Sequence, residues 1–144
     1  MNLEIGIANL TDSEPITQLS NQLGYPTKSD FISKRLTLIL SKPDHIVFVA
    51  KQENQVIGWV HAFIAYRVES DDFVEIGGLV VDKTKQNKGI GSALVNQVHQ
   101  WSKELNMTQV RVRCNVIREK AHRFYLKNGF SLNKKQKVFN FYLP

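Results

Sequence analysis

Cysteine is nearly absent from this chain, because Cys114 is the only one among 144 residues. One cysteine cannot close an internal disulfide, which fits a protein kept in a reducing compartment. The four histidines are scattered, and no His-Glu-x-x-His or Cys-x-x-Cys pattern supplies metal ligands at close spacing. We therefore expect neither disulfide bonds nor a bound metal.

Long apolar runs are also missing, and no stretch approaches the length needed to span a bilayer. The first residues, Met1 to Glu4, lack the basic start and apolar core of an export signal. Apolar residues make up 42% and charged residues 22% of the chain, ordinary values for a soluble globular protein. No repeat, low-complexity tract or linker divides the sequence. These features predict one cytoplasmic domain, residues 1–144, without membrane association.

Acidic residues are scarce in the second part of the chain. Residues 83–144 hold 13 Lys/Arg and only 2 Asp/Glu, a net charge of +11, whereas residues 1–82 hold 6 Lys/Arg and 11 Asp/Glu, a net charge of −5. A basic half suits a polyanionic ligand and an acidic half attracts a cationic one. Solvated surface charge explains the same imbalance unless a phosphate-binding motif lies at the boundary.

Hydrophobic periodicity and turn signals predict an alternation of strands and helices. The strongest helical stripe follows a lysine-rich loop, with apolar residues at three- and four-residue intervals from Ile90 to Leu105. Ser29 or Asp30 is expected to cap the second helix, and Gly129 to end the last one. The expected strands are 3–8, 45–50, 56–66, 73–81, 108–114, a segment near Phe130 and 137–143, and the expected helices are 11–23, 30–40, 90–105 and 118–128. This order predicts an α/β domain with a mixed, largely antiparallel central sheet flanked by helices.

The most distinctive segment leads from strand residues 78–81 through a loop to Gly89-Ile90-Gly91-Ser92 at a helix start. The N–H groups at a helix N-terminus carry partial positive charge, and glycine lets a phosphate approach without a Cβ in the way. No Gly-Lys-Ser/Thr follows, so the segment is not a Walker loop, and the dinucleotide fingerprint would need a third glycine at Leu94. Gly-x-Gly by itself is equally compatible with an ordinary turn.

Two motifs that occur in order along the chain favour a phosphate-binding segment over an ordinary turn. Gln86-x-x-Gly89-x-Gly91 resembles the Arg/Gln-x-x-Gly-x-Gly/Ala motif of the GNAT superfamily, the acyl-CoA-dependent N-acyltransferases. The segment Ala121 to Phe130 is similar to the Ala-x-x-Phe-Tyr-x-x-x-Gly-Phe segment of the same family. The resemblance extends from residue 3 to the C-terminus. It implies a GNAT-like fold in which two splayed parallel strands hold the cofactor, with a bulge at Gly77-Gly78.

The resemblance implies acetyl-CoA as the acyl donor. The backbone of Leu79, Val80 and Val81 would pair with the pantetheine arm, and the amides of residues 87–92 would hold the pyrophosphate. The motif residues expected at the cofactor are Gln86, Asn87, Lys88, Gly89, Ile90, Gly91 and Ser92. Many relatives carry an Asn where this chain has Arg118, and Asn115 is the nearest amide, so either residue is a candidate for a further cofactor contact.

By the same resemblance, Tyr125 is the expected acid that protonates or hydrogen-bonds the departing thiolate, whereas without the motif it would be a helix packing residue. The glutamate base common in the family falls at Gly77, which cannot take a proton. Glu75 lies on the same strand face if pairing is regular and is the candidate base, acting through water, although an exposed strand carboxylate has no such role. A backbone N–H near Leu79 would stabilise the oxyanion.

Tyr25, His61 and Tyr66 are candidates for the border of the acceptor site, although each residue type more often serves packing. The predicted reaction transfers acetyl directly to a primary amine of a small molecule, such as an aminoglycoside-like or amino-acid-like compound. A protein or peptide amine as acceptor, and a CoA-binding module without catalysis, are the alternatives. Nucleic acid is not an expected partner, because the basic half lacks a stacking-aromatic or helix-turn-helix signature. The oligomeric state stays open, with a homodimer as one arrangement.

Overall fold

The structure of the protein is a computed structural model that describes residues 2–24 and 26–144, in two compact units, residues 1–112 and residues 113–144. The first unit contains β1 (Leu3–Ile7), η1 (Leu10–Asp12), α1 (Ser13–Gln22), α2 (Ser29–Leu40), β2 (His45–Gln52), β3 (Gln55–Ala65), β4 (Phe73–Val81), η2 (Lys83–Lys85), α3 (Ile90–Glu104) and β5 (Val110–Val112), where η marks a short 3-10 helix. The second unit contains α4 (Glu119–Lys127). All four predicted helices and the first five predicted strands are therefore present.

The sheet confirms the predicted mixed, largely antiparallel order. Its strands follow one another as β1-β2-β3-β4-β5, and each neighbouring pair from β1 to β4 is antiparallel. β5 runs parallel to β4, with Val74–Ile76 opposite Val110–Val112. β2 and β3 form a hairpin whose turn residues, Glu53 and Asn54, have φ angles of 53° and 64°. A two-residue hairpin turn favours this left-handed conformation because its twist matches that of the strands.

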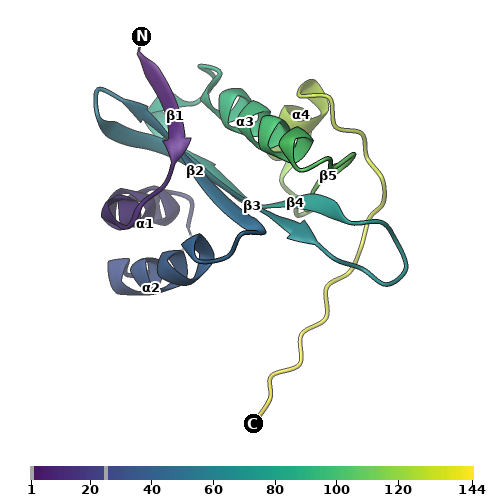
Figure 1. Ribbon diagram of the computed structural model, residues 1–144. Coiled ribbons are helices and arrows are strands. Elements are labelled where there is room, and N and C mark those ends of the chain that lie inside the picture. The colour runs from purple at the N-terminus through teal and green to yellow at the C-terminus, as the bar shows by residue number, and fades with distance from the viewer. Residues whose placement is uncertain (1, 25) are drawn as a thin grey trace. The chain divides into compact units, whose positions relative to one another are not determined.

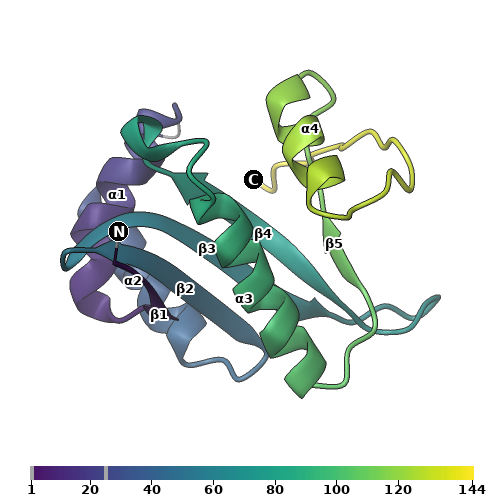
Figure 2. The same ribbon diagram turned by 90° about the horizontal axis from the view of Figure 1, so that it is seen from above.

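Helices cover both faces of this sheet. Figures 1 and 2 show α1 and α2 against one face and α3 against the other. One core cluster joins Val47 and Val49 of β2 to Ile16, Leu19 and Leu36 of the two N-terminal helices. Burying these apolar side chains supplies most of the stabilisation of such a layer, at about 1.5–3 kcal/mol for each large one.

The face of the sheet that α1 and α2 cover also carries aromatic side chains. Val49 pairs with Trp59 and Val47 pairs with His61 in the antiparallel register, and side chains of paired residues lie on the same face. By the same alternation, Phe63 belongs to this face as the partner of His45. We call it the α1/α2 face; it combines an apolar core at one end with two histidines at the other.

The two C-terminal strands predicted near Phe130 and at 137–143 are wrong. The described residues 130–144 contain no regular secondary structure, and large apolar side chains among them are exposed, with Phe139 at 87% and Tyr142 at 84%. Apolar and aromatic residues are not sufficient for a strand, because the backbone N–H and C=O groups of a strand need a hydrogen-bonded neighbour.

The predicted cap of the second helix is also wrong. Lys28 precedes α2 with extended backbone and makes no side-chain cap, while Ser29 and Asp30 lie within the first turn. A side chain caps a helix only from the residue whose backbone is still outside it, so the helix start at Ser29 removes both candidates.

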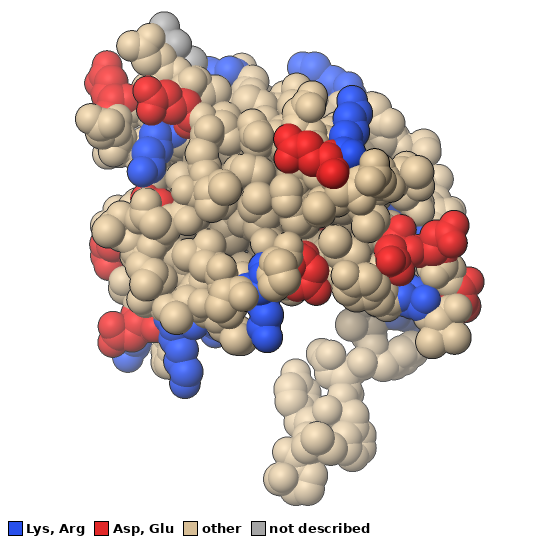
Figure 3. Space-filling model, in the orientation of Figure 1, with Lys and Arg blue, Asp and Glu red and all other residues tan. Residues whose placement is uncertain are grey.

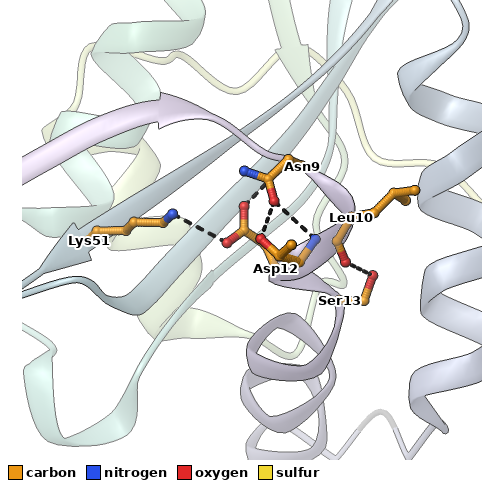
Figure 4. A network of polar contacts seen from close by, with 6 residues as sticks. Asn9, Leu10, Asp12, Ser13 and Lys51 are labelled. Atoms are coloured by element: carbon orange, nitrogen blue, oxygen red, sulfur yellow. Dashed lines mark hydrogen bonds and ion pairs between the residues drawn. The ribbon is translucent and has the colours of Figure 1, made fainter.

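A polar network holds the start of α1 (Figure 4). The Asn9 Oδ1 accepts a hydrogen bond from the Thr11 N–H at 2.9 Å, and an Asp12 carboxylate oxygen accepts one from the Asn9 N–H at 3.0 Å. This reciprocal arrangement is a capping box. The Asp12 side chain, only 5% exposed, also lies 3.4 Å from the Lys51 Nζ on β2. The network therefore ties the first helix to the sheet.

Asp12→Ala should lower the free energy of unfolding by about 1–3 kcal/mol, because it removes a cap and leaves the partly buried Asn9 N–H without its acceptor. Urea denaturation would show a lower midpoint with an unchanged slope. The matched control is Asp30→Ala, an exposed first-turn aspartate of α2, where no side chain caps the helix. Equal midpoints for the two variants would contradict the assigned role of Asp12.

Charged side chains of both signs share the surface. Figure 3 shows Asp and Glu side chains interspersed with Lys and Arg, so the acidic residues do not gather into one patch on this face. Across the described residues, none of the helices combines the length and apolar character that crossing a membrane requires.

Candidate active site

A turn of left-handed residues separates β4 from α3. Asp82 caps η2 by accepting hydrogen bonds from the Thr84 N–H and hydroxyl, each at 2.9 Å. Asn87 and Gly89 then take φ angles of 64° and 81°, and α3 starts at the next residue. An ideal Cβ at Gly89 would meet no other atom within 4 Å, so open space lies beside the helix start.

The first turn of α3 offers an anion site made of backbone. The N–H groups of Gly89 to Ser92 precede the first intrahelical donor, since the Ala93 N–H bonds the Gly89 carbonyl at 3.0 Å. Aligned peptide dipoles make this end of the helix positive. Ile90 can contribute only its N–H, because its side chain is buried in the core at 1% exposed.

The polar side chains of the loop are exposed beside this helix start. Gln86, Asn87 and Lys88 are all exposed, and the Gln86 Nε2 lies 3.5 Å from the Val81 carbonyl oxygen. The Lys83 N–H donates to the Gln22 Oε1 of α1 at 3.1 Å, which ties the loop to the first helix. The segment is thus anchored at its base while its amide and ammonium groups stay accessible.

β4 has an open edge next to this loop. Its pairing with β5 ends at Ile76 and Val112, whereas its pairing with β3 continues to Val81. In the sheet that the described residues form, no strand pairs with residues 77–81 on the β5 side. Backbone donors and acceptors of Leu79 and Val81 are therefore placed where an extended ligand can add to the sheet. Val80 is 5% exposed and packs in the core cluster.

The bulge expected at Gly77-Gly78 is present. His61 pairs with Gly78 and Ala62 with Ile76, so Gly77 is the extra residue of β4. An ideal Cβ at Gly77 would lie 3.0 Å from the His61 Nδ1 and 3.2 Å from the Phe63 Cε1. A side chain at position 77 would therefore compete with the His61 ring for space on the α1/α2 face.

Two histidines form a hydrogen-bonded pair beside the bulge. The His45 Nδ1 lies 3.0 Å from the His61 Nε2, and the two rings stack with centroids 5.2 Å apart. His45 also stacks on Phe63, at a centroid distance of 5.2 Å. Burial, and secondarily the neighbouring His45, lower the pKa of His61 to about 4. Glu75 pairs with Phe63 and so belongs to the same face.

The lowered pKa of His61 predicts that acid destabilises the protein. Between about pH 6.5 and pH 4, the His61 side chain binds a proton in the unfolded chain but not in the folded protein. The stability of the folded state therefore falls as the pH drops through this window. The wild type should lose about 1–3 kcal/mol more than His61→Gln across the window, at about 1.4 kcal/mol for each pKa unit. Urea titrations at several pH values measure the difference, with His122→Gln as the control. Parallel curves for wild type and His61→Gln would contradict it.

In the second unit, Tyr125 lies on α4 among aromatic rings. It packs edge-on against Phe124 and Phe130, at centroid distances of 5.2 and 5.4 Å. Burial raises the pKa of Tyr125 to about 12, with a smaller upward contribution from Cys114 and a downward one from Arg118. The phenol therefore keeps its proton throughout the pH range of an ordinary assay, as a hydrogen-bond donor must.

The two candidates for a further cofactor contact, Asn115 and Arg118, differ in whether the side chain is already engaged in a hydrogen bond. The Asn115 Oδ1 accepts a hydrogen bond from the Ile117 N–H at 3.1 Å, and its carbonyl accepts one from the Arg118 N–H at 3.0 Å. Arg118 directly precedes α4, and its side chain is exposed. The amide of Asn115 is thus part of a turn, whereas the guanidinium of Arg118 is accessible to an anion.

The three candidates for the border of the acceptor site differ in exposure and in whether the structure describes them. His61 is half-buried on β3, Tyr66 directly follows β3 and is 60% exposed, and Tyr25 lies outside the described residues. Sequence reasoning missed His45 as the partner of His61. The turn at Glu53-Asn54 gave no signal for it, because the bulge between Ala50 and Lys51 shifts the register by one residue, and without this shift His45 and His61 would lie on opposite faces.

Comparison with known proteins adds independent information. A family model described as the acetyltransferase (GNAT) family matches residues 11–130. The aminoalkylphosphonate N-acetyltransferase of Salmonella typhimurium is 26% identical over 124 residues, which are 85% of this chain and 75% of that protein.

Solved structures share the fold. An aminoglycoside 6'-N-acetyltransferase from Acinetobacter baumannii superposes with a TM-score of 0.87 at 18% identity, covering 99% of this chain and 100% of that one. A second aminoglycoside N-acetyltransferase, solved in complex with CoA, has a TM-score of 0.87 at 19% identity, covering 96% of this chain and 94% of that one. At such low sequence identities, the structural similarity shows only that the fold is shared.

Proposed function

The chain belongs to the acetyltransferase (GNAT) family, and on that premise we propose that it transfers the acetyl group of acetyl-CoA directly to a primary amine of a small molecule. The observation that carries the proposal is the open backbone site at Gly89 and the start of α3, next to the free edge of β4. A structural neighbour binds CoA, and the site of this chain has the donors that a pyrophosphate needs.

The donor would lie along the loop and the strand edge. Its pyrophosphate would accept hydrogen bonds from the amides of residues 87–92, with Lys88 and Gln86 as polar side chains beside it. Its pantetheine arm would pair with the backbone of Leu79 to Val81. Arg118 or Asn115 would add a further contact, and the exposed guanidinium of Arg118 suits a phosphate better than the turn-bound amide of Asn115.

The chemistry needs an amine nucleophile, an oxyanion donor and a proton for the thiolate. Tyr125 would supply the hydrogen bond to the thiolate, whose parent thiol has a pKa of about 8.5, because its own high pKa keeps the phenol protonated. A backbone N–H near Leu79 would hold the oxyanion. Position 77 carries no carboxylate, so another group on the α1/α2 face must receive the amine proton, and Glu75 is the carboxylate of that face.

A small amine is the favoured acceptor class. The similar protein from Salmonella typhimurium is an aminoalkylphosphonate N-acetyltransferase, and two structural neighbours act on aminoglycosides by name. Tyr25, His61 and Tyr66 would border the acceptor. Four further proposals rest on composition and resemblance alone. They are a single domain over residues 1–144, a cytoplasmic location, the lack of a nucleic acid partner and a homodimeric state.

The test is release of free thiol from acetyl-CoA in the presence of amines. The panel contains aminoalkylphosphonates, aminoglycosides, polyamines, amino acids and peptides with free N-termini. At least one small amine should be acetylated faster than every peptide. If calorimetry detects no binding of acetyl-CoA, the proposal is wrong; if peptides are the best acceptors, the acceptor class is wrong.

A further inference from the structure

The missing carboxylate at position 77 leaves a specific space, and a histidine ring borders it. Gly77 is an exposed bulge residue, and its ideal Cβ lies 3.0 Å from the His61 Nδ1 and 3.5 Å from the His61 Cε1. The nearest polar atom to a side chain at this position is therefore a ring nitrogen that can accept a proton. This nitrogen therefore lies against the bulge of β4, on the α1/α2 face of the sheet.

The second ring nitrogen of His61 is held by His45. A neutral imidazole has one N–H and one lone pair, so a contact of 3.0 Å between His45 Nδ1 and His61 Nε2 requires one ring to donate and the other to accept. When the His61 Nε2–H donates, the lone pair of His61 lies on Nδ1, toward Gly77. The stacking of His45 on Phe63 keeps the pair in one orientation.

We propose that His61 Nδ1, oriented by His45, takes the proton from the acceptor amine during acetyl transfer, in place of the carboxylate that position 77 lacks. This inference rests on the proposed function and names the group that completes its site. His61 would be a catalytic residue, and His45 a positioning residue.

In this step the amine nitrogen bonds to the acetyl carbon, the carbon–sulfur bond breaks, and the N–H proton moves to His61 Nδ1. The thiolate would accept a hydrogen bond from Tyr125 and take a proton from solvent, while His61 would release its proton to solvent by way of His45. The net products are the acetylated amine and free CoA thiol.

Burial on the α1/α2 face determines the protonation state of His61 before the reaction. Burial keeps His61 neutral at pH 7, so the ring does not repel a cationic amine before transfer. Of the titratable groups on this face, His45 of β2 and Glu75 of β4 lie near His61, whereas Lys51 lies farther along β2, where it forms an ion pair with Asp12. The two covering helices contribute only charged side chains that are exposed to solvent, namely Glu14 of α1 and Asp30, Lys34 and Arg35 of α2.

The first test uses His61→Asn and His61→Gln with the best acceptor from the amine panel. At pH 7, kcat should fall by about 10²-fold or more, which is the usual contribution of a general base. The KM for acetyl-CoA should change less than about twofold. The loss should shrink as the pH rises toward the pKa of the amine, because a deprotonated acceptor needs less help. A merely structural role for His61 would not produce this pH dependence.

A rescue variant separates the base from the fold. His61→Ala combined with Gly77→Glu would place a carboxylate in the space that the ring vacates, and Gly77 has no positive φ that forbids a side chain. The double variant should recover at least about tenfold in kcat over His61→Ala. His45→Phe, which keeps the stacking on Phe63, should lower kcat less than His61→Gln does. His99→Gln on α3 is the control with wild-type activity.

Three results would overturn the inference. Wild-type kcat and pH profile in folded His61 variants would remove His61 from the reaction and leave the proposed function standing. A loss of activity in Glu75→Gln alone, with active His61 variants, would assign the proton to Glu75. A wild-type protein that binds no acetyl-CoA would overturn the proposed function itself, and this inference with it.

Discussion

Tyr125→Phe is expected to lower kcat for acetyl transfer by about 10²- to 10⁴-fold, the range over which general acids contribute. The phenol is the only group of its ring that can donate to a departing thiolate, and burial raises its pKa to about 12, so it is protonated whenever the thiolate leaves. Phenylalanine keeps the edge-on packing against Phe124 and Phe130. The KM for acetyl-CoA should therefore stay nearly constant while kcat falls, as steady-state kinetics with varied donor will measure.

Tyr142→Phe is the matched control for this experiment. Tyr142 is 84% exposed and lies in the C-terminal segment without secondary structure. Its variant should keep wild-type kcat and KM. Unchanged turnover in Tyr125→Phe would return Tyr125 to a packing role, and the second sequence motif would then carry no catalytic meaning.

Gly89→Ala is expected to weaken acetyl-CoA binding by about 10- to 100-fold, or about 1.4–2.8 kcal/mol. The added methyl group would occupy the open space beside the first amides of α3, where the pyrophosphate is proposed to approach. At a φ angle of 81°, an alanine also costs about 1–2 kcal/mol of stability, because its Cβ crowds the following carbonyl oxygen. Calorimetry would measure the dissociation constant of the donor, and urea denaturation the stability.

Gly24→Ala supplies the control that separates strain from binding. Gly24 has a φ angle of 80° and open space around its ideal Cβ, yet it lies between α1 and α2 rather than at the start of α3. Both variants should lose similar stability, and only Gly89→Ala should lose affinity for acetyl-CoA. Equal donor affinities would show that the phosphate does not approach at Gly89.

Two features are predicted wrongly from the local sequence pattern, the C-terminal strands and the cap of α2, because neither is determined by that pattern alone. Residues 137–143 are rich in apolar and aromatic residues, as strands are, yet the described structure has no strand there, because pairing depends on a neighbour that no local pattern specifies. The cap at Ser29 or Asp30 fails by a displacement of one or two residues, since α2 begins at Ser29 with Lys28 ahead of it. In contrast, the short gap between the predicted strands 45–50 and 56–66 does contain a hairpin turn, in which Glu53 and Asn54 both adopt the positive φ that a two-residue hairpin needs.

The candidate site likewise has some features that the sequence predicts and others that only the tertiary structure shows. Gln86, Gly89 and Gly91 are distinctive residue types at a characteristic spacing, and together with the motif from Ala121 to Phe130 they predict an anion site at a helix start. The lack of a carboxylate at Gly77 is likewise visible in the sequence. The group proposed to replace it is not visible there, because His61 and Gly77 lie on different strands and meet only across the bulged pairing of β3 with β4.

Most of the helices and strands and the family can be predicted from the amino-acid sequence, and so can the proposed donor site, since periodicity, turn chemistry and the two motifs act through residues that are neighbours along the chain. Which side chains share the α1/α2 face depends instead on long-range pairing. The hairpin register joins His45 to His61, and the bulge leaves Gly77 against the His61 ring. Burial on this face then lowers the pKa of His61, an effect that depends on desolvation by distant segments and so has no signature in any local stretch of sequence.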